Sequence, residues 1–146
     1  MSANREEIER DIEGRRIREE EAAGRRRWAI AEGYLAGPSE ILDDEELGEH
    51  TSKHETLFLL NAGDEPAEVA ITIYFADRGP LGPYAFTVAS RRTRQILLQE
   101  LDEPVIPRGK DFASLIESDR PIVVLATRRR TSRPDDAPLT KIAFAD

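Results

Sequence analysis

The segment Glu68-Val-Ala-Ile-Thr-Ile-Tyr-Phe75 alternates apolar side chains with polar or small ones. An extended chain points successive side chains to opposite faces, so Val69, Ile71, Ile73 and Phe75 share one face. The opposite face receives Glu68, Thr72 and Tyr74. The pattern predicts a β-strand with one face in a core and the other towards solvent.

Similar short segments precede and follow this strand, separated by Gly, Pro and Asp. His54–Ala62 ends at the turn signal Asn61-Ala-Gly-Asp64, and we predict that it forms a hairpin with Glu68–Phe75. Two further strands are predicted at Tyr84–Val88 and Thr93–Gln99. In the first of these, the core-facing side chains should be Tyr84, Phe86 and Val88.

The C-terminal part of the chain continues in the same way. Asp111–Glu117 fits a helix or a strand, Ser118–Pro121 is a predicted turn, and Ile122–Thr127 is the most apolar strand. Leu139–Ala145 is the last predicted strand. Strands without intervening amphipathic helices predict an all-β fold, an antiparallel β-sandwich or jelly-roll-like domain.

Trp28-Ala-Ile-Ala-Glu-Gly-Tyr34 is the first predicted strand. Strict alternation places Trp28, Ile30 and Glu32 on one face. Two interpretations remain open. The strand could lie at a sheet boundary with Glu32 in water, or the indole could form the floor of a polar site that includes the carboxylate.

The chain divides into a charged leader, residues 1–27, and a sandwich domain, residues 28–146. The leader is rich in Arg, Glu and Ala with a thin apolar stripe, so it is either helical or disordered. Within the domain, Leu35–Lys53 is an irregular insert that contains the acidic run Asp43-Asp-Glu-Glu46. An insert of this length is a surface loop or a segment ordered by a neighbour.

The chain has 146 residues, 34% of them charged, and a net charge of −8. The excess negative charge lies beyond the leader, because residues 1–27 balance eight arginines against eight acids. This excess of negative charge repels phosphate backbones, which argues against nucleic acid as a partner. The only basic clusters that could bind nucleic acid are Arg91–Arg94 and Arg128–Arg133.

The residue types also limit which reactions and metal sites the chain could support. The chain has no cysteine, only two histidines, His50 and His54, and no nucleophile or phosphate-binding motif, so we expect no enzyme and no cofactor. A metal site is disfavoured because His54 and Glu55 point to opposite faces of a strand. The N-terminus lacks a secretory signal and no apolar run is long enough for a membrane span, so we expect a cytoplasmic protein.

Several predicted strands carry aromatic, amide, hydroxyl and guanidinium groups together. Such groups are typical of sites that bind polyhydroxylated small molecules. The residues are Trp28, Glu32, His54, Asn61, Tyr74, Arg92, Thr93, Gln95 and Thr127. Each also has an ordinary structural interpretation, for example Asn61 as a turn residue.

Short motifs along residues 28–146 occur in the order and spacing of a known family. They include Trp28–Tyr34, Leu60-Asn-Ala-Gly-Asp-Glu65, Ile71-Thr-Ile-Tyr-Phe75, Arg91-Arg-Thr93 and Pro121-Ile-Val-Val124. By these motifs the chain resembles the sensory rhodopsin transducer family. The resemblance implies a small cytoplasmic β-sandwich that forms homotetramers and is not an enzyme. It further implies a membrane photoreceptor as partner in one member and sugar-like ligands in others.

Transferred position by position, the resemblance implies a set of ligand-binding residues in this chain. They are Trp28, Glu32, His54, Glu55, Asn61, Tyr74, Arg91, Arg92, Thr93, Asp111, Thr127 and Arg128. The chain departs from the family pattern at four positions that are polar in the family. Three of them are apolar here, Leu97, Leu125 and Ala126, and the fourth is Gln95. The changes would make a polar pocket drier, so the ligand differs or binding is lost.

The sequence therefore predicts a non-enzymatic cytoplasmic signalling domain that binds a small polar, sugar-like ligand and forms a homo-oligomer. The alternative is a protein–protein adaptor without a ligand. In that case the leader and the acidic insert would dock to the cytoplasmic face of a membrane receptor.

Overall fold

The computed structural model describes residues 4–10, 22–37, 42–44, 49–51, 53–130, 139–141 and 143–146. Of the leader, residues 5–10 are helical, and the side chain of Asn4 caps them by accepting the amide of Glu7 at 2.9 Å. The rest of the leader up to residue 21, and residues 38–41, 45–48 and 52 of the insert, lie outside the described residues. The first strand begins at Arg25, so the end of the segment assigned to the leader belongs to the sandwich.

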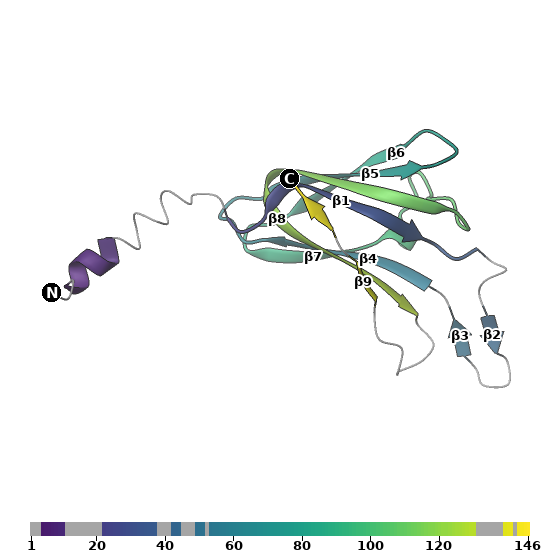
Figure 1. Ribbon diagram of the computed structural model, residues 1–146, viewed down its shortest axis with the longest axis horizontal. Coiled ribbons are helices and arrows are strands. Elements are labelled where there is room, and N and C mark those ends of the chain that lie inside the picture. Colours follow the sequence, from purple (N-terminus) through teal and green to yellow (C-terminus); the bar gives the residue numbers. More distant parts are fainter. Residues whose placement is uncertain are drawn as a thin grey trace.

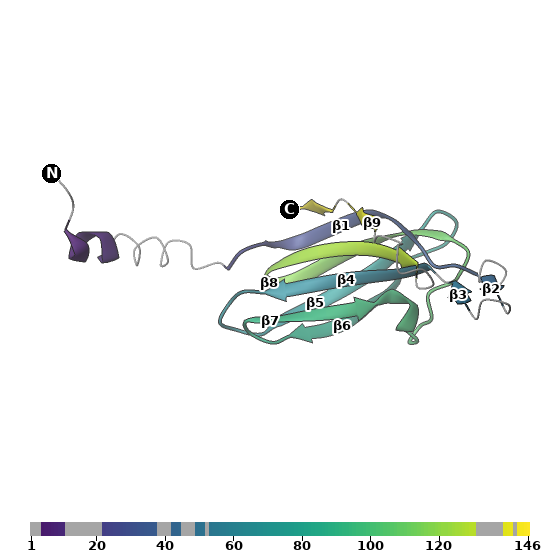
Figure 2. The same ribbon diagram turned by 90° about the horizontal axis from the view of Figure 1, so that it is seen from below.

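Two antiparallel sheets pack face to face, which confirms the predicted β-sandwich (Figures 1 and 2). The first sheet consists of β10 (Phe144–Ala145), β1 (Arg25–Tyr34), the first half of β8 (Asp111–Arg130), β5 (Ala67–Phe75) and β6 (Leu81–Val88). The second consists of β9 (Leu139–Lys141), the second half of β8, β4 (Lys53–Asn61) and β7 (Arg92–Leu97), which continues into the 3-10 turn η2 (Leu98–Glu100). From the insert, β2 (Leu42–Asp44) pairs with β3 (Glu49–Thr51).

The 20-residue strand β8 belongs to both sheets. Residues 111–118 pair with β1 and β5, whereas residues 123–130 pair with β4. The predicted turn at Ser118–Pro121 is therefore wrong, because the chain stays extended there and passes from one sheet to the other. Pro121 has no amide hydrogen to donate to a ladder, which suits the point at which β8 changes its partners.

The predicted hairpin between His54–Ala62 and Glu68–Phe75 is also wrong. The corresponding strands lie in opposite sheets, since β4 pairs with β7 and β8 while β5 pairs with β6 and β8. Both strands carry apolar side chains at the middle of one face, and packing these faces against each other buries more apolar surface than pairing the strands edge to edge. The predicted last strand, Leu139–Ala145, is divided between β9 and β10, which join different sheets.

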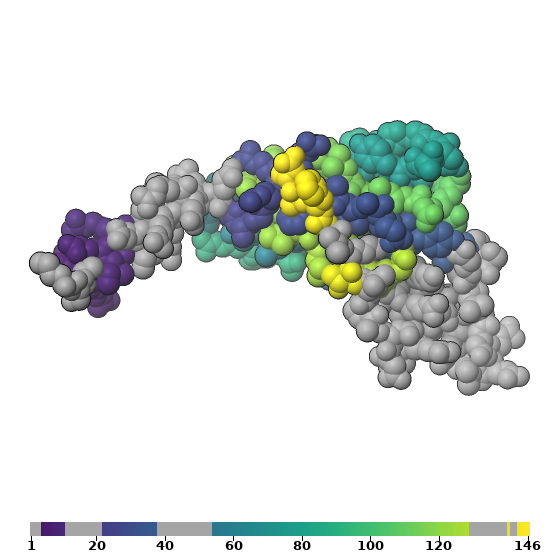
Figure 3. All heavy atoms as spheres, viewed as in Figure 1, coloured from purple at the N-terminus to yellow at the C-terminus, as the bar shows by residue number. Residues whose placement is uncertain are grey.

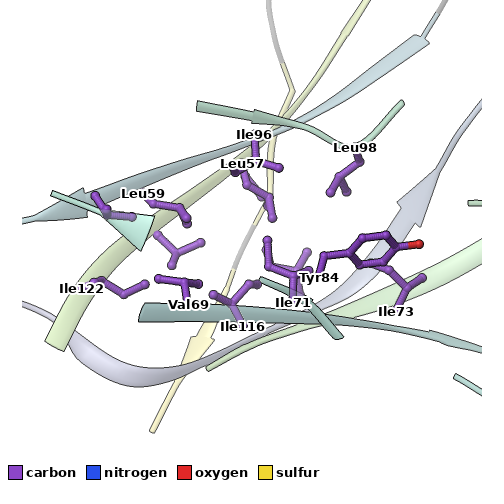
Figure 4. Packing of buried hydrophobic residues seen from close by; sticks show 14 of the residues in the cluster. Leu57, Leu59, Val69, Ile71, Ile73, Tyr84, Ile96, Leu98, Ile116 and Ile122 are labelled. Carbon is purple, nitrogen blue, oxygen red and sulfur yellow. The ribbon is translucent and has the colours of Figure 1, made fainter. Parts of the chain in front are cut away.

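The core fills the space between the sheets (Figure 4). Leu57 and Leu59 of β4 face Ile71 and Ile73 of β5, and all four side chains are at most 2% exposed. Each such side chain contributes roughly 1.5–3 kcal/mol through burial. The predicted orientation of β6 is confirmed, because its core-facing side chains are Tyr84, Phe86 and Val88.

Gly33 of β1 is required by a close approach to the ring of Phe112. A Cβ atom at residue 33 would lie 2.3 Å from Cε2 of that ring, which is only 4% exposed and has no room to swing away. Gly33→Ala should therefore lower the free energy of unfolding by about 1–3 kcal/mol, measured by urea denaturation. Gly79→Ala is the matched control, since a Cβ there meets no atom within 4 Å; equal effects would contradict the argument.

Candidate functional site

Glu32 is positioned by an irregularity in β1. Ile30 pairs with Ser114 and Gly33 with Phe112, so β1 holds one more residue than β8 over this stretch. Such a bulge re-aims side chains and interrupts the alternation of faces. Ile30 is buried in the core, but Glu32 is half exposed and its carboxylate contacts the guanidinium of Arg128.

Glu55 lies on the inner face of β4, in line with the core residues Leu57 and Leu59, yet it is only 2% exposed. Its Oε1 atom accepts the amide hydrogen of Tyr34 at 3.0 Å and the Nε hydrogen of Arg128 at 2.8 Å. Its own amide donates to Oε1 of Gln99 in η2 at 3.2 Å. The carboxylate therefore connects β1, β4 and β8 at one end of the sandwich.

Arg128 lies opposite Glu55 in the ladder between β4 and β8. Burial alone would lower the pKa of this guanidinium, but the hydrogen bonds to Glu55 and Glu32 outweigh it and the pKa is raised. Arg128 is thus charged at every physiological pH and bridges two carboxylates. We call Glu32, Glu55 and Arg128 the charge cluster.

The charge cluster lies where the insert leaves and rejoins the sandwich. The insert begins directly after Tyr34, the last residue of β1, and ends shortly before Glu55 in β4. Asp111, another predicted site residue, pairs with Tyr34 in the adjacent ladder and therefore lies at the same end. Of the predicted ligand-binding residues, the structure brings Glu32, Glu55 and Arg128 into contact and places Asp111 nearby.

Asn61 lies at the opposite end of β4 and is completely buried. Its Nδ2 atom donates to the carbonyls of Glu65, Val88 and Ala89 at 2.7, 3.0 and 3.3 Å, and its Oδ1 atom accepts the amide of Gly63 at 3.0 Å. These contacts use both amide hydrogens to hold the turn that carries the chain from one sheet to the other.

Three more predicted residues lie near Asn61 rather than near the charge cluster. Arg92 and Thr93 pair with Asn61 and Leu60 across the ladder between β7 and β4. Arg91 adopts a left-handed conformation, φ 55°, and binds Asp64 at 2.6 Å. The predicted set is thus divided between the two ends of the second sheet.

Trp28 is separated from the charge cluster along β1. Its Nε1 atom donates to the carbonyl of Ile122 at 2.9 Å and its ring packs against the core. Ile122 precedes Arg128 by six residues, about 20 Å of extended strand. The described contacts of the indole are therefore structural ones.

The remaining predicted residues lie on faces that point away from the core. Tyr74 is 43% exposed on β5. His54 and Thr127 are half-buried and belong to the strand positions that alternate with the inward-facing Glu55 and Arg128. The structure does not bring these three side chains to the charge cluster.

Tyr34 and Gln99 contact the charge cluster although the sequence did not single them out as site residues. Tyr34 contributes its backbone amide, a group that no side-chain pattern reveals. The contact between Gln99 and Glu55 joins residues 44 positions apart and depends on the turn η2. No local signal in the sequence identifies either residue.

The departures from the family pattern gather on the outside of the second sheet. Leu125 is 45% exposed, and both Gln95 and Leu125 pair with Phe58 on that face. Only Ala126 faces the core. We call the apolar residues of this surface the outer face; they are Phe58, Leu60, Leu97, Val123 and Leu125.

In the part of the chain that the structure describes, no three His, Cys, Asp or Glu side chains are close enough to hold a metal ion. No helix among those residues is long and apolar enough to cross a bilayer.

The fold and the charge cluster define a class of protein, a small antiparallel β-sandwich with an ionised group of side chains at one end. The family model described as Anabaena sensory rhodopsin transducer matches residues 23–145. The chain belongs to this family, as the resemblance predicted.

Two solved structures agree with this assignment. The Anabaena sensory rhodopsin transducer is 45% identical, with a TM-score of 0.60, over 73% of this chain and 98% of that one. A Thermotoga maritima protein, titled "Crystal Structure of Thermotoga maritima 1070", is 25% identical, with a TM-score of 0.67, over 86% and 97% of the respective chains. A comparison with curated protein sequences found no match.

Proposed function

We propose that the protein is a non-enzymatic cytoplasmic signalling domain that binds a small polar, sugar-like ligand at the charge cluster. The observation that carries the proposal is the pair formed by Glu55 and Arg128, whose side chains are 3% and 20% exposed. Carboxylate and guanidinium groups held side by side accept from and donate to neighbouring hydroxyl groups, as a polyhydroxylated ligand requires.

Stability alone does not account for this pair. Removing two charges from water costs several kcal/mol per ion, and well-packed apolar residues of similar volume are often at least as stabilising. Strands β4 and β8 carry apolar residues at the adjacent inward positions, Leu57 and Ala126, which pair with each other. The charged pair at the end of this apolar row is therefore better explained by ligand binding than by a contribution to core packing.

The proposal is tested with Glu32→Gln, because Glu32 is half exposed and its loss leaves the buried pair intact. Isothermal titration with a panel of mono- and disaccharides should detect a ligand for the wild-type protein, and Glu32→Gln should weaken its binding about tenfold, as expected for one charge-assisted hydrogen bond. Glu117→Gln is the matched control, since Glu117 is similarly exposed beside Arg27. No binding by the wild type, or equal effects of the two variants, would refute the site.

The family supplies a second candidate, the adaptor function. The name of the Anabaena relative describes a transducer of a sensory rhodopsin, which makes a membrane receptor a candidate partner for this chain. The leader is then the docking segment. The test removes residues 1–21 and stops there, because Ala22 already packs near Gly63 and β1 begins at Arg25. Unchanged binding to a receptor encoded beside this gene would exclude a docking role for the leader.

We also propose that the protein forms homo-oligomers, a tetramer as the resemblance implies, through the outer face. The outer face is apolar where an antiparallel sheet normally presents polar residues to water, and its neighbours are uncharged, namely Thr56, Thr93, Gln95 and Thr127. In a chain of net charge −8, an uncharged surface allows two copies to approach with the least repulsion.

Leu125→Glu should dissociate this assembly, because it places a carboxylate in the centre of the outer face. Light scattering coupled to size exclusion should show a multiple of the monomer mass for the wild type and a smaller mass for the variant. Val105→Glu is the control, since Val105 is 61% exposed but lies away from the outer face. A wild type that elutes as a monomer at about 100 μM would contradict the proposal.

A further inference from the structure

The end of the sandwich opposite the charge cluster contains a hollow of about 480 Å³. Three elements enclose it, namely the start of β1, the turn after β4 and the point at which β8 changes sheets. Its lining includes charges of both signs, Arg26 and Arg120 on one side of the account and Asp64 and Glu65 on the other. The volume suits a small molecule.

The wall formed by the start of β1 depends on Gly24. This residue has φ 116°, and a Cβ atom on it would lie 2.0 Å from the carbonyl oxygen of Ile122. Only glycine permits this approach. The backbone before β1 is therefore held close to the point at which β8 changes sheets, and the hollow lies between the two.

A second hollow of about 240 Å³ adjoins the first, since Arg26 and Pro121 line both. It adds Arg25 and Asp146, one charge of each sign. Asp146 is held beside β1, because its backbone exchanges hydrogen bonds of 2.9 and 3.2 Å with Arg27, whose Nη1 atom lies 4.0 Å from its carboxylate. Figure 3 shows the start of β1 and the C-terminal strand β10, in yellow, side by side. Both hollows are thus of mixed charge.

Two of the four charged side chains of the larger hollow are already engaged. Asp64 accepts from Nε and Nη2 of Arg91 at 2.9 and 2.6 Å, and Arg26 has an interaction of its own. Among the residues that the structure describes, the side chains of Glu65 and Arg120 bind neither each other nor any third residue. One carboxylate and one guanidinium therefore line the same hollow without neutralising each other.

We propose that this hollow binds a small amino acid, with its α-carboxylate at Arg120 and its α-ammonium group at Glu65. A guanidinium donates paired hydrogen bonds to a carboxylate, and a carboxylate accepts from an ammonium group. An amino acid carries both groups on one carbon atom, so it satisfies both side chains at once, whereas a simple anion or cation satisfies only one.

The uncharged lining restricts the size of this amino acid. The residues that complete the wall around the two charges include Ala22, Gly63 and Pro121, which leave room for a short ligand side chain and offer it no further charge. Glycine, alanine and serine fit this description. The site lies at the Asn61 end of β4 and the charge cluster at the Glu55 end, so the inference does not depend on saccharide binding.

The test is isothermal titration of the full chain at neutral pH with glycine, L-alanine and L-serine. At least one of them should bind. Two analogues of L-alanine then separate its charges, since alaninamide lacks the carboxylate and N-acetyl-L-alanine lacks the ammonium group. Each analogue should bind about tenfold more weakly than L-alanine, as expected for one lost charge-assisted contact.

Two variants assign each charge to its partner. Arg120→Gln should weaken binding of L-alanine about tenfold and bind alaninamide equally well, and Glu65→Gln should do the same with N-acetyl-L-alanine. Both side chains are exposed and bind no other residue that the structure describes, so neither change should impair folding. Arg78→Gln is the control and should leave the affinity within about twofold, because Arg78 stacks on Phe75 away from the hollow.

Amide chemical shifts locate the bound amino acid independently. Addition of L-alanine should move the resonances of Gly63 and Arg120 and leave that of Glu55 in place. The proposal is overturned if none of the three amino acids binds, if both analogues bind as tightly as L-alanine, or if Arg120→Gln binds as well as wild type. None of these results bears on saccharide binding at the charge cluster, which is measured with Glu32→Gln.

Discussion

Replacing Arg128 with alanine should lower the free energy of unfolding by about 3–5 kcal/mol, because it removes the guanidinium that donates to the buried carboxylate of Glu55. For a chain of this size the corresponding fall in Tm is roughly 10–15 °C, measured by circular dichroism. Arg78→Ala, which removes an exposed arginine, should change the Tm by only a few degrees.

The double variant Glu55→Leu/Arg128→Met distinguishes the effect of losing both charges from the effect of losing one. It removes both charges and keeps apolar volume at the end of the core, so it should recover most of the stability lost in Arg128→Ala. If the double variant were as unstable as the single one, the loss would arise from packing rather than from the missing ion pair with Glu55. If it is stable and no longer binds a saccharide, the charges serve binding.

Asn61→Ala should lower the free energy of unfolding by about 3 kcal/mol or more. The amide of Asn61 serves three backbone carbonyls and one backbone amide, and each buried group left without a partner costs about 1–3 kcal/mol. Urea denaturation at equilibrium measures the loss. Thr93→Ala is the control, since Thr93 is an exposed residue on the neighbouring strand β7.

The same variant decides the role of Asn61. If the residue holds the turn, Asn61→Ala that is still folded at low temperature should bind a saccharide with wild-type affinity. A variant of unchanged stability that has lost binding would instead assign Asn61 to the ligand, as the resemblance implied. Stability and saccharide affinity, measured on the same variant, distinguish a structural role of Asn61 from a role in ligand binding.

The strands and the core could be predicted from the sequence because both depend on local periodicity. The alternation of Val69, Ile71 and Ile73 is visible in eight consecutive residues, and the structure buries all three. The pairing of strands could not be predicted in the same way. The turn after Asn61 is compatible with a hairpin, and only the competition among all the apolar faces places β4 and β5 in different sheets.

The charge cluster, like the pairing of the strands, could be predicted only in part from the sequence. Glu32 was selected from the residue types of the predicted strands, whereas Glu55 and Arg128 entered the set through the family resemblance, together with residues at the opposite end of the second sheet. The contacts of Arg128 with Glu55 and Glu32 span 73 and 96 positions, so no spacing along the chain predicts them. The bulge between Ile30 and Gly33, which directs Glu32 towards Arg128, likewise becomes visible only when β1 is aligned with β8.

Because β8 runs without interruption through both layers, the two layers are covalently one piece at their centre. Sliding of one layer over the other would have to break ladder hydrogen bonds on both sides of Pro121. A displacement of either layer would therefore strain the ladders of the other, since both layers share one backbone segment.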